Sequence, residues 1–206
     1  MKNLSRAPKQ DRSRARVERI LASAAALLAG DAPEKVTVRA LAARSGVSVG
    51  TIYQFFNDVE AVRAAVAERT YADFRTALRT RLTEETARAS PGDFFCKLIE
   101  VIGELQQRHP EVGCLVRADR GDAFRVAFAD ELRALIAAHI RSAFARAFPR
   151  MKRGDRELKL EVAQAVLLGA LQAMPTGPRA ARAAHLMQAK AAVSLYANAS
   201  FVQRRP

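Results

Sequence analysis

Residues 37–56 read TVRALAARSGVSVGTIYQFF, and no other stretch says as much about how the chain folds. The pattern predicts two short helices with a tight turn between them. Thr37 and Ser48 are suited to cap these helices, because a hydroxyl at the N-cap accepts a free backbone N–H of the first turn. Gly46 tolerates the positive φ that ends a helix. Two short helices joined by a turn of three or four residues that contains Gly match the helix-turn-helix unit.

The two predicted helices each have an inner and an outer side. Leu41 and Ala42 give the first helix an inner face, and Ile52 and Phe56 point inward at i, i+4 in the second. The residues left facing outward are Ser48, Val49, Thr51, Tyr53 and Gln54. Hydroxyls, a phenol and an amide can meet phosphates and base edges. Many helical proteins contain two short helices and a Gly turn, so the spacing leaves both DNA binding and ordinary packing open.

Helical spacing of apolar residues recurs along the rest of the chain, with no strand-like alternation of useful length. Asn57 and Glu60 resemble a capping box, and a long helix is expected to begin there. Further helices are predicted over 12–29, 58–86, 91–109, 130–148, 156–173 and 179–201, with short pieces in 111–128. The sequence therefore predicts an all-α fold: a three-helix domain over 1–56, with a basic arm at 1–12, and a larger helical bundle over 57–206.

Composition and charge limit the classes of protein. The chain has 206 residues, of which 50% are hydrophobic and 27% charged, so it has material for a packed core and is not disordered. The 34 Lys and Arg outnumber the 21 Asp and Glu, and a formal charge of +13 favours a polyanionic partner. Residues 1–56 contain 10 basic and 4 acidic side chains, so the surplus is densest there.

The N-terminus has the outline of a signal peptide, with basic residues before the apolar run 20–30. However, apolar residues between Val17 and Leu28 follow the i, i+3, i+4, i+7 spacing of an amphipathic helix. The run is also shorter than the ~20 residues of a transmembrane helix. We therefore expect a soluble, cytoplasmic protein without membrane contact, in which Cys96 and Cys114 are reduced thiols.

The N-terminal part of the sequence resembles the tetracycline-repressor (TetR) family of regulators. The resemblance rests on residues 17–28 as the first helix, on 37–42 and on 46–56, and covers about the first 70 residues. It implies DNA contacts by Thr37, Arg39, Ser48, Val49, Gly50, Thr51, Tyr53 and Gln54. Members commonly carry Lys at the positions of Val49 and Val59, so Val49 is expected to contact a thymine methyl instead.

The predicted second domain is rich in phenylalanine. By resemblance, its helices form the core in which the family binds an effector, and an apolar or aromatic molecule suits such a lining. The candidate pocket residues are Phe94, Phe95, Leu98, Phe124, Phe128, Ile136, His139 and Phe144. Aromatic residues at helical spacing are also the usual content of a plain core, and His139 equally fits a hydrogen-bonded core histidine. His109, beside Pro110, is interpreted as a helix end.

The last two predicted helices suit dimerisation, because small residues among larger ones allow close helix approach. Paired across a two-fold axis, they make a four-helix interface. The candidate interface residues are Ala163, Val166, Leu167, Ala170, Met174, Leu186, Val193 and Tyr196. Packing within one chain is the alternative interpretation.

These features predict a homodimeric, ligand-responsive transcriptional regulator, acting as a repressor that a small molecule releases from palindromic operator DNA. Two alternatives remain open: a DNA-binding activator or architectural protein without an effector, and a protein-interaction regulator on the same fold. An enzyme is not expected. The sequence contains no Gly-rich phosphate loop, no metal-ligand spacing and no set of His, carboxylate and nucleophile on a plausible common surface. No cofactor and no metal are expected either.

Overall fold

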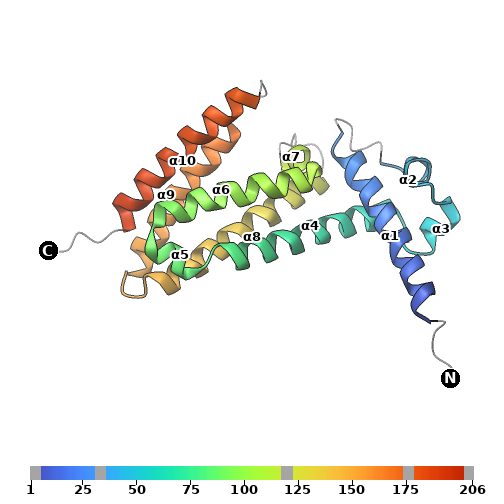
Figure 1. Cartoon of the computed structure of the whole chain (residues 1–206), viewed down its shortest axis with the longest axis horizontal. Helices are drawn as coiled ribbons and strands as arrows, with labels where there is room; N and C mark the ends of the chain where they lie inside the picture. The colour runs from blue at the N-terminus through green and yellow to red at the C-terminus, as the bar shows by residue number, and fades with distance from the viewer. Residues whose placement is uncertain (1–5, 31–35, 117–122, 174–178, 202–206) are drawn as a thin grey trace. The chain divides into compact units, whose positions relative to one another are not determined.

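The computed structural model describes residues 6–30, 36–116, 123–173 and 179–201, and these ranges contain ten helices and no strand (Figure 1). The helices are α1 (Arg6–Leu28), α2 (Val38–Ser45), α3 (Val49–Tyr53), α4 (Val59–Arg81), α5 (Glu84–Ala89), α6 (Pro91–Arg108), α7 (Pro110–Val116), α8 (Ala123–Ala147), α9 (Arg153–Gln172) and α10 (Arg179–Phe201). The predicted all-α class, with a helix-turn-helix domain at the N-terminus and further helices after it, is confirmed.

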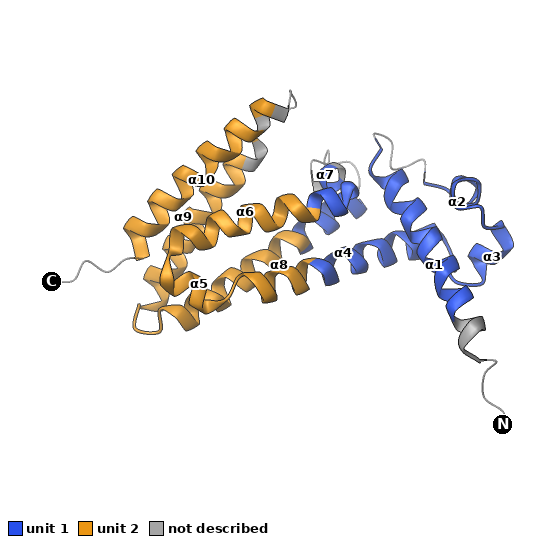
Figure 2. Ribbon diagram, in the orientation of Figure 1, with its two compact units in different colours: residues 1–73, 106–131 blue, residues 74–105, 132–206 orange. Residues whose placement is uncertain are grey.

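The helices gather into two compact units (Figure 2). Unit 1 comprises residues 1–73 and 106–131, and unit 2 comprises 74–105 and 132–206. The two units are groups of residues that contact one another more than they contact the rest of the chain. The division predicted after residue 56 is of another kind, because it separates a DNA-binding part from the rest of the chain. That functional division stays a prediction.

The core of unit 1 is organised by α1. Its residues Ile20, Ala24 and Leu28 are fully buried and stand one helical turn apart, so they form one continuous stripe. Helix α1 packs against both α2 and α7, and α2 packs against α3. Leu41 of α2 is fully buried and Ile52 of α3 is 1% exposed. The two short helices therefore add one large buried side chain each to a core that α1 supplies.

A second part of unit 1 joins α4 to the start of α8. The ring of Tyr71 stacks on that of Phe128 with centroids 5.2 Å apart, and the Tyr71 hydroxyl donates to the Phe128 carbonyl at 3.3 Å. Burial raises the pKa of Tyr71 to about 12, and the nearby carboxylates of Glu131 and Glu68 act in the same direction. The phenol therefore stays protonated at neutral pH and keeps its donor.

Unit 2 is built around an aromatic cluster from α6, α8 and α10. Phe144 is fully buried, with its ring centroid 5.1 Å from that of Phe94 and 4.7 Å from that of Phe201. Both pairs meet edge to face, the arrangement that aromatic quadrupoles favour. The cluster ties three helices together that are far apart in the sequence.

The helix boundaries differ from those predicted at four places. The helix expected over 58–86 is two helices, because the side chain of Thr83 accepts from the Thr86 N–H while that of Thr86 accepts from the Thr83 N–H. Helix α4 is capped by Asp58, which accepts from the Ala61 N–H at 2.7 Å, and not by Asn57. Helices α1 and α8 both begin earlier than predicted, at residues 6 and 123.

Helix α6 begins where α10 comes closest to its backbone. The N–H of Gly92 donates to the Asn198 side chain at 2.8 Å, and a β-carbon at this position would collide with Ser194 and Asn198. Gly103, in the same helix, has open space where its β-carbon would be. The glycine at 92 is therefore required by the approach of α10, whereas the glycine at 103 is not.

This contrast gives a matched pair of stability predictions. We expect Gly92→Ala to lower the free energy of unfolding by ~1–3 kcal/mol, because the added methyl overpacks the α6–α10 contact. Gly103→Ala is expected to raise it by ~0.5–1 kcal/mol, since alanine loses less backbone entropy in a helix. Chemical denaturation of both variants checks the pair, and an equal effect at the two positions contradicts it.

Candidate nucleic-acid interface

The stretch 37–47 folds as predicted. Thr37 has an extended backbone, with φ −121° and ψ 158°, and its hydroxyl oxygen accepts from the Ala40 N–H at 3.2 Å. Gly46 ends α2 with φ +66°, and its N–H donates to the Ala42 carbonyl at 3.1 Å. Val47 follows and is 5% exposed, so it fills the angle between the helices. The turn is held by local hydrogen bonds and one buried side chain.

Helix α3 is short and well capped. The Ser48 hydroxyl oxygen accepts from the Thr51 N–H at 3.2 Å and lies 2.8 Å from the Thr51 hydroxyl oxygen. Ile52 anchors the helix on its inner side. The chain leaves α3 at Gln54, whose N–H donates to the Thr51 carbonyl. One apolar contact and one cap therefore set the direction in which the outer side of α3 faces.

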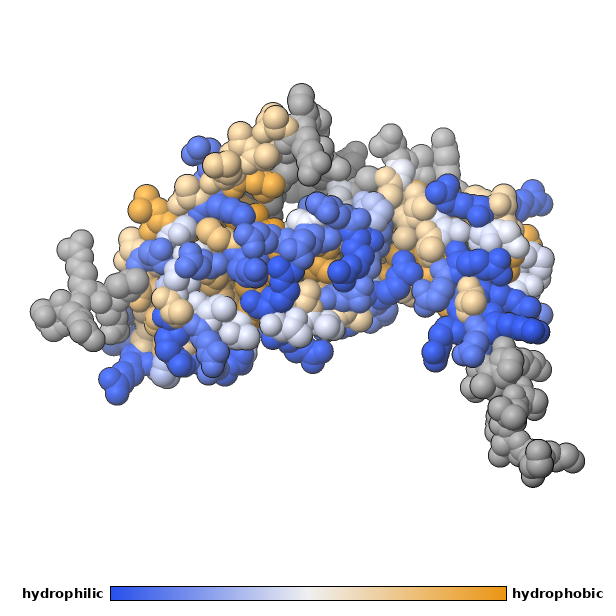
Figure 3. Space-filling view, in the orientation of Figure 1, coloured by the Kyte–Doolittle hydropathy of each residue, from blue (hydrophilic) through white to orange (hydrophobic). Residues whose placement is uncertain are grey.

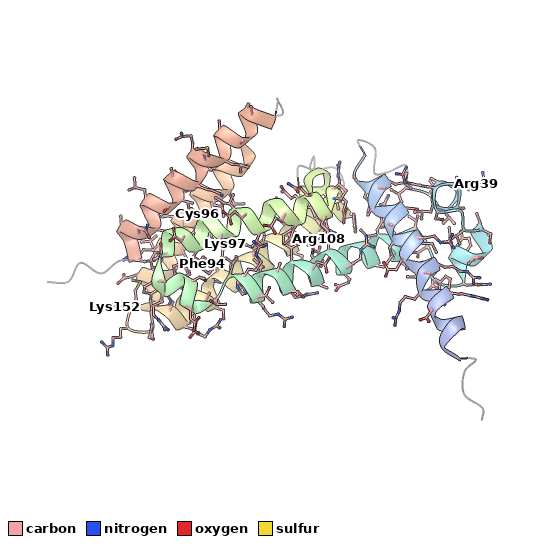
Figure 4. The ribbon with its side chains drawn as sticks, viewed as in Figure 1. Arg39, Phe94, Cys96, Lys97, Arg108 and Lys152 are labelled. Carbon is pink, nitrogen blue, oxygen red and sulfur yellow. The ribbon has the colours of Figure 1, made fainter. Side chains whose placement is uncertain are left out.

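The outer sides of α2 and α3 carry most of the predicted DNA contacts. Tyr53 is 54% exposed and Val49 39%. Gly50, Gln54 and Arg39 are also exposed, and Figure 4 labels Arg39 on α2. Residues 37–56 contain no carboxylate, so nothing in this stretch repels a phosphate. The exposed set is polar or cationic apart from Val49 and Gly50.

The hydroxyls of Thr37, Ser48 and Thr51 are engaged in local hydrogen bonds but keep binding capacity. A hydroxyl that accepts a backbone N–H still has its own proton to donate. The proton of Thr37 is therefore available to an acceptor such as a phosphate oxygen. Ser48 and Thr51 bond to each other, which uses one of their two protons and leaves the other. The structure thus brings the predicted polar contacts together without using up their donors.

The basic arm predicted at 1–12 is helical from residue 6 onward, while residues 1–5 lie outside the described part. Helix α1 carries exposed arginines at positions 12, 14, 16 and 19. These four positions lie within the helix predicted over 12–29. The structure extends that helix backward into the predicted arm, to residue 6.

The predicted effector-pocket residues fall into different parts of the fold. Phe124 and Phe128 belong to unit 1. The fully buried residues Phe94, Phe95, Leu98 and Phe144 belong to unit 2. Half-buried His139 has its Nε2 2.7 Å from the carbonyl of Leu82, just beyond α4, which satisfies its ring. Ile136 is also half-buried.

Three of the eight predicted interface residues are buried within the chain. Ala163 and Val193 are fully buried, and Leu167 is 4% exposed, so these three pack within one chain. Half-buried members of the predicted set are Val166, Ala170, Leu186 and Tyr196; Met174 lies outside the described residues. The large apolar side chains exposed on α9 and α10 are instead Leu158, Val162, Leu168, Met187 and Leu195. Figure 3 shows apolar residues gathered over α10.

The structure makes a reactive role of Cys96 less favourable and reveals a polar network around His109. Burial raises the pKa of the Cys96 thiol, which favours the unreactive protonated form; the side chain of Cys114 lies outside the described part. His109, interpreted as a helix end, is 4% exposed and bonds to buried Glu111 and to half-buried Asp73. No sequence signal pointed to that network, because Asp73 lies on α4, 36 residues before His109.

The described residues contain neither a membrane-spanning helix nor a cluster of metal ligands. In that part of the chain no helix is both long and apolar enough to cross a membrane. The same residues hold no group of three or more His, Cys, Asp or Glu side chains placed to bind a metal ion.

A helix-turn-helix whose second helix presents a polar face outward has the geometry with which DNA-binding regulators of transcription enter the major groove. The family model described as "Bacterial regulatory proteins, tetR family" matches residues 20–66, from within α1 to within α4. Residues 20–66 therefore carry the DNA-binding domain found in this family, which indicates a DNA-binding regulator of transcription. None of the curated proteins compared with the chain matches it.

The glycines at the turn and on α3 give a second matched pair. Gly46→Ala forces a β-carbon into the left-handed region and is expected to cost ~1–2 kcal/mol of stability. Gly50→Ala adds a methyl into open space within α3 and is expected to be neutral or stabilising by up to ~1 kcal/mol. Thermal unfolding measures both, and a loss at Gly50 equal to that at Gly46 argues against the turn geometry.

Proposed function

We propose that the chain is a homodimeric repressor of the TetR family, which binds a palindromic operator and is released by a small molecule. We place it in the cytoplasm, where its DNA is. The observation that carries the DNA-binding part is the outer side of α3, where Tyr53 and Gln54 are exposed while Ile52 anchors the inner side.

The residues proposed to contact DNA divide by chemistry. Arg39 is suited to a guanine edge, because a guanidinium can donate two parallel hydrogen bonds to O6 and N7. Thr37, Ser48 and Thr51 are suited to phosphates, to which hydroxyls donate. Val49 offers only methyl groups, so it favours a thymine at its step. Gly50, Tyr53 and Gln54 complete the proposed contact set.

The dimer part is supported by the apolar surface of α9 and α10. Met187 is 70% exposed and Leu195 is 76% exposed on α10, and Leu158 is 62% exposed on α9. Exposed apolar side chains gathered on one surface mark an interaction site. A second copy of the chain suits it, because a two-fold dimer places two recognition helices ~34–36 Å apart, or a multiple of that, to read a palindrome. We therefore assign the interface to these exposed residues and not to Ala163, Leu167 and Val193.

The proposed response to a small molecule depends on how the aromatic side chains of unit 2 pack. The rings of Phe94, Phe95 and Phe144 lie 5.1 to 5.8 Å apart, so a molecule that enters there has to displace a packed side chain. Such a molecule binds the arrangement in which that side chain is displaced, and not the arrangement in which the three rings are packed together. That difference in affinity is what a ligand needs in order to shift a conformational equilibrium.

Variants on the proposed DNA surface test the assignment. We expect Arg39→Ala to lose ~1–3 kcal/mol of discrimination at one base pair. Thr51→Ala is expected to weaken binding to all sequences about equally, because it removes a phosphate contact. Band-shift titrations with the DNA upstream of the chain's own gene, intact and with single base changes, measure both.

Arg79→Ala is the matched control, because Arg79 is exposed on α4 and belongs to unit 2. It removes the same charge but should leave the discrimination unchanged. The absence of any binding by the native protein at low salt contradicts the proposal. Binding to a protein partner that survives Arg39→Ala and Tyr53→Phe favours the protein-interaction alternative.

Substitution on α10 tests the dimer. Leu195→Glu places a charge on the proposed interface and is expected to give monomers, whereas the single chain tolerates it because position 195 is exposed. Val126→Glu, at an exposed position of α8, is the control and should leave the dimer intact. Light scattering after size exclusion measures the mass. A dimeric Leu195→Glu, or a native chain that is monomeric at every concentration, overturns this part.

A further inference from the structure

Residues of α1, α4 and α7, together with His109 and the end of α6, line a partly open hollow within unit 1, which we name the polar hollow after its charged side chains. It measures ≈ 390 Å³, at the small end of the range of ligand pockets. Its charged and polar lining comprises Arg69, Asp73, Arg108, His109 and Glu111, and Figure 4 labels Arg108 at the end of α6. Its apolar lining comprises Ala22, Ala25, Ala26 and Pro110. Side chains of both charges thus meet over a small alanine surface.

One buried carboxylate in this hollow is only half satisfied. Glu111 is fully buried, and its Oε1 atom lies 3.0 Å from the Thr70 hydroxyl and 3.2 Å from Nδ1 of His109. Its other oxygen, Oε2, has no hydrogen-bond partner in the described part of the protein. Leaving a carboxyl oxygen buried and unpaired costs free energy, so this atom needs a donor that the described residues do not supply.

The neighbouring histidine cannot supply that donor. Nε2 of His109 lies 2.9 Å from a carboxylate oxygen of Asp73, while Nδ1 faces Oε1 of Glu111. Both ring nitrogens are therefore already directed at carboxylate oxygens. Any proton that His109 carries goes to Asp73 or to Oε1, and Oε2 is still left without one.

An orphaned donor lines the same hollow. Nε of Arg69 is buried and has no hydrogen-bond partner among the described residues, while Nη1 of this arginine lies 3.6 Å from a Glu18 carboxylate oxygen. Arg108 is exposed and adds a second positive charge to the lining. The hollow thus offers an unused N–H donor with positive charge and an unused carboxylate acceptor.

We propose that this hollow is a binding site for a small zwitterion of the α-amino-acid class. Its ammonium group donates to Oε2 of Glu111, and its carboxylate accepts from Nε of Arg69 with Arg108 nearby. A short side chain lies on Ala22 and Ala26. An anion alone leaves Glu111 unpaired, and a cation alone leaves Arg69 unpaired, so neither fits as well. The site is independent of whether the chain binds DNA.

Calorimetric titration of the full chain with glycine and L-alanine tests the site, with ethylamine and propionate as single-charge fragments of L-alanine. We expect saturable binding of a zwitterion that also raises the melting temperature with ligand concentration. Neither fragment should bind comparably. Glu111→Gln is expected to weaken binding at least about tenfold, because a hydrogen bond to a charged group is lost.

Two further variants keep the test decisive if Glu111→Gln does not fold. Arg108→Ala, at an exposed position, is expected to weaken zwitterion binding without loss of stability. Arg12→Ala removes an exposed arginine of α1 outside the hollow lining and should bind like the native chain. No saturable binding of either zwitterion, which means that water alone fills the hollow, overturns the proposal. So does equal binding by propionate or ethylamine, or unchanged affinity in Arg108→Ala.

Discussion

The positive φ of Gly46 is the constraint on which the DNA-binding surface depends. Helix α3 has five residues, far below the ~12–15 at which an isolated helix becomes even marginally stable. It exists because the chain turns sharply after α2 and brings Ile52 onto the core. The left-handed backbone of Gly46 lets the chain turn within two residues, Gly46 and Val47. Only glycine adopts this backbone conformation without steric cost. The backbone angle of one residue thus fixes the position of a helix that has little stability of its own.

The short length of α3 also explains why its outer side is free for another partner. Val47 and Ile52 bury the inner side, so Tyr53 and Gln54 have no structural duty in the core. Ser48 and Thr51 combine both demands, since the Ser48 hydroxyl caps the helix, the Thr51 hydroxyl bonds to it, and the pair retains one proton for an external acceptor. The inner side of α3 therefore stabilises the fold, and its outer side is left for the proposed DNA contacts. Only Ser48 and Thr51 take part in both.

The sequence predicted part of what local hydrogen bonding decides and missed what distant packing decides. Thr37 and Ser48 cap as expected, because a cap involves a hydroxyl and an N–H three residues away, whereas α4 is capped by Asp58 and not by Asn57. The break at Thr83 was hidden, since apolar residues continue at helical spacing through Leu82. Burial of His109 could not be foreseen either, as Asp73 is brought to it by the fold. Three of the candidate interface residues, Ala163, Leu167 and Val193, are buried within the chain, because periodicity finds an apolar face without saying what covers it.

The polar network of α4 and α7 has a physical cost that stability does not explain. Replacing a buried ionic group by a well-packed apolar one is often neutral or stabilising, so Glu111 is a poor choice if packing were its only role. Helix α1 packs on both α7 and α2, which makes it the structural element common to the polar hollow and the helix-turn-helix. A molecule that completes the hydrogen bonds of Glu111 favours whichever arrangement of α7 presents that carboxylate. It can influence α2 only to the extent that it binds one arrangement of α1 and α7 more tightly than another.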